Sequence, residues 1–554
     1  MDAGSREWDN PRGAPAHDGA SMDPLPERAS AASPALTGRF VAPFPSAPPT
    51  VALALALALL AAWTAVAAPA AAQQDVRDVL GVTHVAGRYN FTGEDFLDEG
   101  ADQLLALGTR VIKVWFTPDI AGRYPFNSSW GAVPVDLVAL AQKPYFQALF
   151  AKPFSTYILV FQSVNPAPQD LGAGTPDAAL QVEQKETYDL ARYLLATYAG
   201  SGKTFILQNW EGDHLLRAGL AADAEPSHQR VLTMALWWNA HQDGVSQARA
   251  EVPAQGVNVY HAIEVNALTD AMHGKVTAAN DVLPFTHADL YSYSSWDVEF
   301  DPDALSAALD YLQGKAPPSA LFGSRNVYLG EFGAAKDQVP DNGQRAAVIR
   351  RLTSAALAWG VRYAVYWQLY CNEAAQPYTG RPANSDLRGF WLIRPDGVKT
   401  AMWSDLERRL PARLYRLALR TAAGSYVTAA GSGGGPLTSS AAVAGPWQVF
   451  TATTADEQPL HSAGPIYLQA HNGMYVRAER GLAGRVVAGD WDADRSKGLV
   501  IRKASGGKEI GDGDLVTLQT AAGRYLTLDR ASGALLANRR APGPDSMFRV
   551  ELQP

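Results

Sequence analysis

The sequence predicts an α/β protein with a (β/α)8 TIM barrel, followed by an all-β domain with the β-trefoil fold. Two observations lead to this fold class. Between residues 73 and 412, eight strand-like segments alternate with helix-like segments, as βα units do around a closed parallel barrel. From residue 413 to 554, a similar segment occurs three times, and such repetition is typical of a trefoil.

Composition limits the classes of protein to consider. The chain has 554 residues, 47% of them hydrophobic and 18% charged, which indicates a globular protein of more than one domain. A net charge of −8 argues against nucleic-acid binding. The single cysteine, Cys371, excludes an internal disulfide framework, and no Cys or His cluster has zinc spacing. We therefore expect neither a metal nor a cofactor.

The first 72 residues do not resemble a folded domain. Residues 1–50 are rich in Pro, Ala and Ser and are predicted to be disordered. Residues 51–72 form an Ala/Leu run that ends in a small-residue cleavage pattern, so we expect a signal peptide cleaved after Ala72. The 50 residues before this run are unusually many for the start of a signal peptide, and translation starting at Met22 would shorten them. A membrane anchor is the alternative, although the run is marginal for spanning. The expected location is outside the cell or at its surface.

Eight apolar segments rich in β-branched and aromatic residues predict the barrel strands. They are Val79–Ala86, Arg110–Phe116, Thr156–Gln162, Thr204–Trp210, Val257–Ile263, Ala288–Tyr293, Asn326–Glu331 and Tyr363–Tyr370. Helical periodicity between them predicts the helices. The clearest are Asp95–Leu107, Gln181–Tyr198, Ser227–Arg249, Pro302–Gln313 and Gly343–Trp359. A doubly wound open sheet is the competing architecture, but no strand is followed by a Gly-rich phosphate loop.

Two predicted strands each deliver a glutamate at the carboxyl end. Glu211 follows the strand at Thr204–Trp210, and Glu331 ends the strand at Asn326–Glu331 with a glycine on either side. In a barrel, functional side chains gather where the strands end. Two carboxylates at that edge are what a glycosidase needs. The alternative is that each glutamate only caps the helix that follows.

Nine further residues near the predicted strand ends are candidates for binding substrate. Polar side chains could hydrogen-bond to sugar hydroxyls, and flat aromatic rings pack well against the C–H bonds of a sugar face. Each could instead belong to the core. The candidates are His84, Trp115, Asn209, His261, Glu264, Tyr291, Tyr293, Trp296 and Trp367.

Lys113 lies inside the second predicted strand. If the barrel forms, this side chain must be buried, and a buried ammonium needs a carboxylate beside it. We expect a structural ion pair in preference to a catalytic role.

The barrel segment resembles the clan A retaining glycoside hydrolases, the cellulase-like, family 5-like superfamily. The matching features are Glu211 after the fourth strand, Glu331 in a Gly-Glu-Phe-Gly motif after the seventh, and Tyr366–Trp367 on the eighth. Tyrosines near the end of the sixth strand also match. The resemblance implies that Glu211 is the acid/base, that Glu331 is the nucleophile, and that the substrate is a β-linked oligo- or polysaccharide.

The resemblance has a further implication and one departure. It implies that Tyr291 or Tyr293 donates a hydrogen bond to Glu331. The clan usually has Asn immediately before the acid/base, whereas here that position is Trp210 and the Asn is Asn209. Because side chains of a strand alternate, Asn209 would share a face with the glutamate unless a bulge re-aims it.

The repeats after residue 413 predict the second domain. Each contains a turn glycine followed by a tyrosine, and the tyrosines Tyr426, Tyr475 and Tyr525 are 49 and 50 residues apart by their numbers. The sequence of residues 413–554 resembles that of fascin-like β-trefoils. The resemblance implies the β-trefoil fold only and does not imply an activity. We expect this domain to fold alone and to act either as a glycan-binding module or as a lid or spacer.

Two functions from different classes follow from these patterns. The first is a secreted, monomeric retaining β-glycosidase with an appended trefoil. The second is a non-catalytic carbohydrate-binding or adhesive protein built on a degenerate barrel. The presence of both carboxylates favours the enzyme. Metal-dependent hydrolysis is disfavoured, because no predicted strand carries a His-x-His pair or a bridging lysine.

Overall fold

The structure is a computed structural model that describes residues 73–553, apart from 165–170, 222, 254, 430, 432, 434, 457, 480–483 and 493–496. The predicted disordered segment 1–50 and the predicted signal peptide 51–72 lie outside the described residues. Within the described part of the chain, no helix combines the length and the apolar character needed to cross a membrane.

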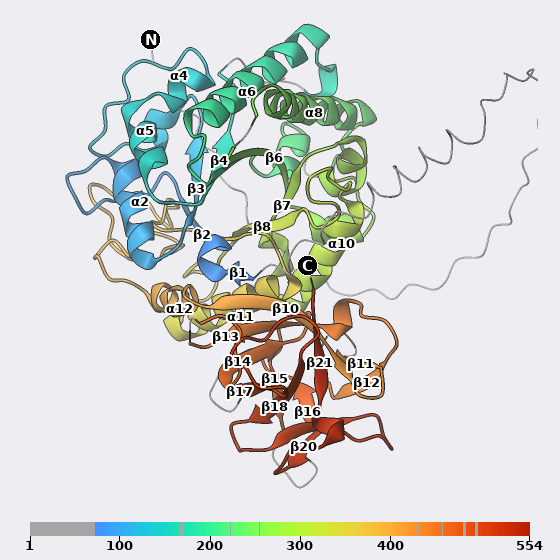
Figure 1. The fold of residues 1–554 in the computed structure, drawn as a ribbon. Helices are drawn as coiled ribbons and strands as arrows, with labels where there is room; N and C mark the ends of the chain where they lie inside the picture. The colour runs from blue at the N-terminus through green and yellow to red at the C-terminus, as the bar shows by residue number, and fades with distance from the viewer. Residues whose placement is uncertain are drawn as a thin grey trace, which may run out of the picture. The chain divides into compact units, whose positions relative to one another are not determined.

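Eight parallel strands close into a barrel with helices outside the ring (Figure 1). Neighbouring strands follow one another in the chain, and the last pairs with the first. All eight predicted strands are present, which confirms the TIM barrel. They are β2 (Leu80–His84), β3 (Val111–Phe116), β4 (Thr156–Phe161), β5 (Lys203–Gln208), β6 (Val257–Val265), β7 (Leu290–Ser294), β8 (Val327–Phe332) and β9 (Ala364–Tyr366).

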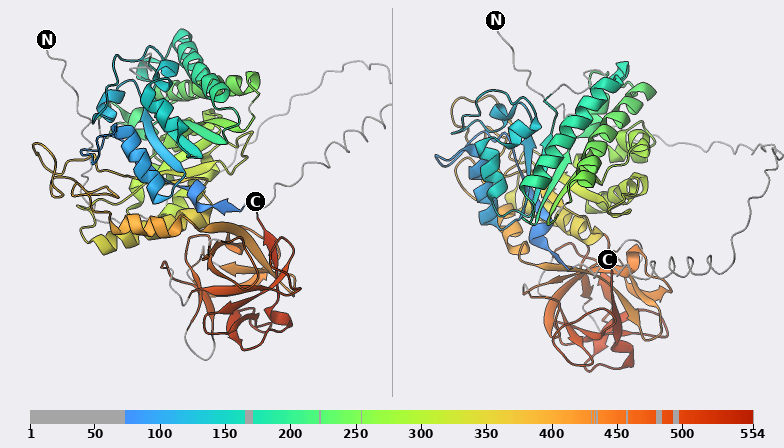
Figure 2. Two further views of the ribbon diagram at one scale, coloured as in Figure 1. Left: turned by 60° about the vertical axis from the view of Figure 1, so that its left-hand side comes forward. Right: turned by 45° about the horizontal axis from the view of Figure 1, so that its top comes forward.

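The five predicted helices are also present, with shorter ones between and after them. The predicted helices are α2 (Phe96–Leu107), α6 (Asp177–Thr197), α8 (His228–Glu251), α10 (Pro302–Lys315) and α11 (Asn342–Trp359). The others are α3 (Ile120–Arg123), α4 (Leu137–Ala141), α5 (Pro144–Ala151), α7 (Gly212–Arg217), α9 (Leu268–Met272) and α12 (Ala401–Arg409). Figure 2 shows α6 and α8 side by side on the outside of the barrel.

Local capping accounts for the bounds of two of these helices. The Asp95 side chain accepts a hydrogen bond from the Asp98 amide at the start of α2, and Gly108 ends that helix with φ of 102°. Asp341 caps α11 in the same way, and Gly360 ends it with φ of 94°. An acidic N-cap satisfies a free amide, and glycine adopts the left-handed conformation at little cost.

The barrel interior has an apolar floor with a polar layer above it. Because side chains alternate along a strand, the residue two positions after a floor residue also points inward. Lys113 follows the floor residue Val111 in this way, and Glu264 follows the floor residue Ala262. The polar layer therefore lies toward the carboxyl ends of the strands. The floor is one cluster of buried side chains: Val111, Ile158, Ile206, Ala262, Leu290, Tyr328 and Val365.

The C-terminal domain is an antiparallel β-barrel. Six strands pair in a closed circle: β10 (Arg413–Thr421), β13 (Val449–Thr454), β14 (Gly464–Gln469), β17 (Leu499–Lys503), β18 (Leu515–Thr520) and β21 (Phe548–Leu552). Three hairpins accompany it: β11 (Tyr426–Ala429) with β12 (Leu437–Ala441), β15 (Val476–Ala478) with β16 (Val486–Ala488), and β19 (Tyr525–Leu528) with β20 (Leu535–Arg539).

The repeat glycines sit at turns, as their sequence context predicts. Gly424, Gly473 and Gly523 have φ of 88°, 89° and 73°, in the left-handed region that favours glycine. The repeat tyrosines differ in burial: Tyr475 is buried, whereas Tyr426 is half-buried and donates a hydrogen bond to Glu551 at 2.7 Å.

The barrel and the C-terminal domain have separate hydrophobic cores, and one core gives way to the other near the predicted boundary between residues 412 and 413. Leu414 is the last residue of the barrel core, and Tyr415 is the first of the core of the C-terminal domain. One short strand crosses this division, because β1 (Gln74–Asp75) pairs with β10 through Gln74 and Leu414. The start of the described chain is thus tied to the second domain.

Candidate active site

Glu211 reaches the barrel mouth through an unusual backbone conformation. Strand β5 ends at Gln208, and Glu211 immediately precedes α7 with φ of 28° and ψ of 77°. A non-glycine residue with positive φ is uncommon and re-aims its side chain relative to the preceding strand. The Glu211 side chain lies inside the mouth with 1% of its surface exposed.

Glu331 faces the interior because β8 contains a bulge. The pairing of β8 with β7 skips one residue, since Tyr293 pairs with Leu329 and Ser294 pairs with Glu331. The extra residue is Gly330, and a β-bulge of this kind lets two successive residues face the same side. A Cβ at Gly330 would overlap the Ser292 hydroxyl. Glycine is therefore required beside this carboxylate.

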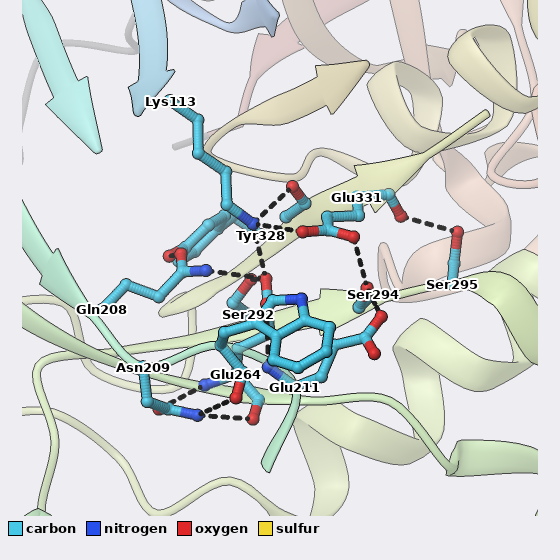
Figure 3. Close-up of polar contacts among 12 residues, drawn as sticks. Lys113, Gln208, Asn209, Glu211, Glu264, Ser292, Ser294, Ser295, Tyr328 and Glu331 are labelled. Carbon is cyan, nitrogen blue, oxygen red and sulfur yellow. Dashed lines mark hydrogen bonds and ion pairs between the residues drawn. The ribbon is translucent and has the colours of Figure 1, made fainter. Parts of the chain in front are cut away.

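Lys113 connects the candidate nucleophile with a second buried carboxylate (Figure 3). Its Nζ lies 2.9 Å from Glu331 Oε1, 3.1 Å from Glu264 Oε2 and 3.2 Å from the Gly330 carbonyl oxygen. Burial alone would lower the pKa of Lys113, but the two carboxylates outweigh it and raise the pKa above its ordinary value. The expected buried ion pair is confirmed.

Glu264 lies beneath the mouth and is occupied by protein groups. Its Oε2 accepts hydrogen bonds from Lys113 Nζ, from Gln208 Nε2 at 2.8 Å and from Ser292 Oγ at 2.8 Å. Its Oε1 accepts from the Glu211 amide at 3.2 Å. Glu264 is thus fully buried and hydrogen-bonded by protein groups, and substrate binding by this residue stays a prediction. Glu264 holds the backbone that carries the candidate acid.

Ser294 joins the two candidate catalytic carboxylates. Its Oγ lies 2.9 Å from Glu211 Oε1 and 3.1 Å from Glu331 Oε2. Figure 3 shows Ser294 in contact with both carboxylates. The indole nitrogen of Trp296 also donates to Glu331 Oε2, at 3.2 Å. Trp296 begins the short helical turn η5 (Trp296–Val298) directly after β7. Ser294 and Trp296, two residues apart in the same segment, therefore both contact Glu331 Oε2.

The charges around Glu331 alter its acidity. Its pKa is raised overall from 4.5 to about 7: burial is the largest cause, Lys113 opposes the rise, and the negative charges of Glu264 and Glu211 add to it. This carboxylate is therefore poised near neutral pH, as acids and bases of active sites often are.

His214 is a neighbour of the candidate acid that sequence reasoning missed. Its Nδ1 lies 2.6 Å from Glu211 Oε2, and its ring stacks on Trp210 at a centroid distance of 5.7 Å. His214 lies three residues after Glu211, one turn along α7. That spacing was the available signal, because residues three apart meet on a helix.

Two predicted substrate-binding histidines point away from the site. His84 Nε2 lies 2.7 Å from the Phe96 carbonyl oxygen, and its ring packs beneath α2. His261 packs against His241 of α8, at a ring distance of 5.7 Å. Both lie on the outer face of their strands, so both predictions are wrong. Burial also lowers the pKa of His84 to about 4.

The two predicted tyrosines of β7 also point outward. The Tyr291 hydroxyl lies 3.2 Å from Thr286 Oγ1, and the Tyr293 hydroxyl donates to Asp297. Because neighbouring residues of a strand face opposite sides, it is Ser292 and Ser294 that enter the barrel. Neither tyrosine therefore reaches Glu331. The expected hydrogen bond to that carboxylate is made by Ser294 and Trp296 instead.

Asn209 is engaged by the backbone of β6. Its Nδ2 donates to the Glu264 carbonyl at 3.1 Å, and its Oδ1 accepts from the Glu264 amide at 3.0 Å. Both ends of its amide are thus used to hold β5 and β6 together. The structure thus gives Asn209 a structural role, and its contact with sugar stays a prediction.

The three predicted tryptophans do gather near the carboxylates. Trp115 and Trp367 meet edge to face at 5.7 Å, and Lys113 Nζ lies 5.7 Å from the Trp115 ring centre. Trp115 is 7% and Trp367 8% exposed. Trp296 contacts Phe390 at 5.4 Å. These aromatic groups line the same end of the barrel as Glu211 and Glu331.

No group of three or more His, Cys, Asp or Glu side chains in the described residues is arranged to hold a metal ion. The residues that meet at the mouth are donors and acceptors suited to proton transfer and to binding a polar organic substrate.

No family model matches the chain, and no curated protein matches it. Among solved structures, it is similar to a family 5 xyloglucanase from Paenibacillus pabuli, with 12% identity over 60% of this chain and 98% of that one and a TM-score of 0.38. It is also similar to a GH39 enzyme from Xanthomonas axonopodis pv. citri, with 14% identity over 63% of this chain and 73% of that one and a TM-score of 0.40.

Part of the chain is also similar to the SDF2-like protein from Arabidopsis thaliana, with 15% identity over 25% of this chain and 93% of that one and a TM-score of 0.22. Function is therefore inferred from the geometry of the site.

Proposed function

We propose that residues 73–412 form a retaining glycoside hydrolase that cleaves β-linked glycans, with Glu331 as nucleophile and Glu211 as acid/base. One observation carries the proposal: the two carboxylates come from different strand ends and both contact the hydroxyl of Ser294. They lie at the carboxyl end of a parallel barrel, where barrel enzymes carry out their chemistry.

The separation of the carboxylates supports retention of configuration. Since Ser294 Oγ lies 2.9 Å from Glu211 Oε1 and 3.1 Å from Glu331 Oε2, these two oxygens are at most the sum, 6.0 Å, apart. Retaining glycosidases have carboxyl groups about 5–5.5 Å apart, whereas inverting enzymes need about 6.5–9.5 Å to admit a water.

The partners of Glu331 suit a nucleophile. Lys113 and Trp296 can only donate hydrogen bonds, so one oxygen of Glu331 accepts from each. Donors of this kind favour the ionised carboxylate. Glu211 has the Ser294 hydroxyl and the His214 ring beside it, both of which can exchange a proton.

The reaction proceeds in two displacements. First, a Glu331 oxygen attacks the anomeric carbon, the glycosidic bond breaks, and its electron pair goes to the leaving oxygen, which takes the proton of Glu211. Then the Glu211 carboxylate takes a proton from water while the water oxygen attacks the anomeric carbon. The ester bond breaks and its electron pair returns to Glu331. Two inversions leave the configuration unchanged.

The tryptophans are proposed to bind the sugar. Trp115, Trp296 and Trp367 surround the carboxylates, and aromatic faces pack against sugar C–H bonds. These three are among the nine predicted substrate-binding residues.

Hydrolysis of a panel of aryl β-glycosides, with the product anomer followed by NMR, tests the proposal. Release of the β-anomer is expected, and a 2-deoxy-2-fluoro glycoside should label the peptide that contains Glu331. Glu331→Gln should lose several orders of magnitude in kcat. The matched control is Glu407→Gln, which changes an exposed carboxylate of α12. An α-anomer, or label at another residue, contradicts the mechanism.

Azide rescue tests the second role separately. Glu211→Ala should recover activity on an activated aryl glycoside when azide is added, and the product should be the β-glycosyl azide. The small anion enters the space left by the carboxylate and attacks the glycosyl-enzyme. Normal activity without azide would show that Glu211 is not the acid/base.

A non-catalytic carbohydrate-binding protein is the second candidate, favoured by one observation. Glu211 is 1% and Glu331 2% exposed, so a sugar reaches them only if neighbouring side chains move. Binding of a glycan without any turnover, by a protein with an unchanged fold, would establish this alternative.

We also infer that residues 413–554 are a β-trefoil that binds glycan or spaces the barrel from its surroundings. The threefold tyrosine repeat, the circle of six strands and the three hairpins support the fold. Export through residues 51–72 and a monomeric state complete the proposal. Mass spectrometry of the N-terminus of the mature protein and its mass in solution test these two points.

A further inference from the structure

Ser294 lies between the two candidate catalytic carboxylates with a single proton to share. The residue is fully buried, and β7 holds it by pairing with Glu331 in β8. A hydroxyl carries one hydrogen and two lone pairs, so it can donate to only one of two neighbours. Both of its carboxylate contacts have the length of a hydrogen bond, at 2.9 and 3.1 Å. A second proton is therefore needed between Ser294 and one of the carboxylates.

The other partners of Glu331 determine where that proton lies. Lys113 donates to Oε1 of Glu331, and Trp296 donates to Oε2, the same oxygen that Ser294 contacts. Neither partner can accept a hydrogen bond. Glu331 is thus surrounded by donors, and Ser294 completes the set by donating as well. The Ser294 lone pairs then face Glu211, whose oxygen must carry the second proton.

We propose that Ser294 is a positioning residue that keeps the proton on Glu211 and the negative charge on Glu331, so that acid and nucleophile are prepared together. This inference deepens the proposed function and rests on it. The chain of hydrogen bonds runs from the Glu211 carboxyl to the Ser294 oxygen, and from the Ser294 hydroxyl to the Glu331 carboxylate. Reversal of its direction would exchange the two roles.

Charged or titratable groups on three neighbouring elements act on this chain of hydrogen bonds. Lys113 of β3 contacts Glu331, whereas Glu264 of β6 places a negative charge below it. His214 of α7 contacts the far oxygen of Glu211, at 2.6 Å from Oε2. These groups remain when the hydroxyl is removed. Loss of Ser294 therefore isolates its own contribution.

The pH profile of kcat/KM distinguishes positioning from a merely structural role. Without the hydroxyl, Glu331 loses a donor to its ionised form and Glu211 loses an acceptor for its acidic form. In Ser294→Ala the acidic limb should move up and the basic limb down, each by about one pH unit. Ser294→Thr, which keeps the hydroxyl, should restore both limbs. Ser306→Ala, which removes a buried hydroxyl on α10, is the matched control.

A titration that does not depend on turnover separates this inference from the proposed function. In protein carrying 13C-labelled glutamate, with signals assigned through Glu211→Gln and Glu331→Gln, the two carboxyls should titrate closer together in Ser294→Ala than in the wild type. Wild-type protein inactive on all glycosides would contradict the proposed function only. Unchanged titration in Ser294→Ala, or equal loss of kcat/KM at every pH, would overturn the inference.

Discussion

Replacing Glu331 by glutamine should stabilise the protein increasingly as the pH rises. The pKa of Glu331 is raised from 4.5 to about 7, chiefly by burial. Between these pH values the folded protein keeps one proton in the coupled site that Glu331 shares with Glu211 through Ser294, whereas both glutamates of the unfolded chain have released theirs. The free energy of unfolding of the wild type therefore falls as pH rises through this window. Glu331→Gln carries no such proton and lacks this dependence.

The size of the effect follows from the same two values. The difference between 4.5 and 7, at about 1.36 kcal/mol per pH unit, corresponds to about 3 kcal/mol. The side chain is 2% exposed, so solvent screens little of it. For a barrel of about 340 residues, about 3 kcal/mol corresponds to about 4 °C in Tm. The comparison across pH cancels the constant cost of placing the glutamine NH2 near the Trp296 indole N–H.

Thermal unfolding of both proteins at several pH values between 4.5 and 8 measures the effect. The Tm of Glu331→Gln minus that of the wild type should increase by about 4 °C across this range, mostly below pH 7. Ser306→Ala, which removes no titrating group, should show a constant difference. A constant difference for Glu331→Gln as well would refute the raised pKa and the electrostatic picture of the site.

Three further predictions follow from the site and the domain boundary. Lys113→Met should move the acidic limb of kcat/KM up by about one pH unit or more, because the ammonium favours ionised Glu331; an unmoved limb contradicts this. Gly330→Ala should lower the stability by about 1–3 kcal/mol, whereas Gly314→Ala, in open space on α10, should raise it by about 0.5–1 kcal/mol. Deletion of 413–554 should leave hydrolysis of aryl glycosides intact and weaken action on polymeric glycan; an inactive, soluble barrel fragment would show that β10 is needed to hold β1.

Sequence periodicity was sufficient for the architecture of the barrel. Each of the eight strands is rich in β-prone residues, most of them apolar, and this local pattern needs no knowledge of tertiary contacts. The expected burial of Lys113 followed from the same reasoning, since a charge inside a strand of a closed barrel has to meet a carboxylate.

Whether an individual side chain points into the barrel or toward the outer helices was less predictable, because it depends on strand register and on β-bulges. His84, His261, Tyr291 and Tyr293 lie near strand ends, but strand alternation turns them outward under the helices. Counting parity from the apolar floor residue Leu290 would have selected the serines of β7 instead. The family resemblance favoured the tyrosines, and this preference was wrong.

What the sequence by itself determined is the eight-stranded barrel and the two strand-end glutamates, since both are properties of short segments. Only the tertiary structure decided how those glutamates meet. The bulge at Gly330 and the left-handed backbone at Glu211 turn both carboxylates inward, and pairing of β7 with β8 brings the Ser294 hydroxyl between them. The physical reason is that a carboxylate's direction and acidity depend on groups supplied by distant strands, and local periodicity contains no information about them.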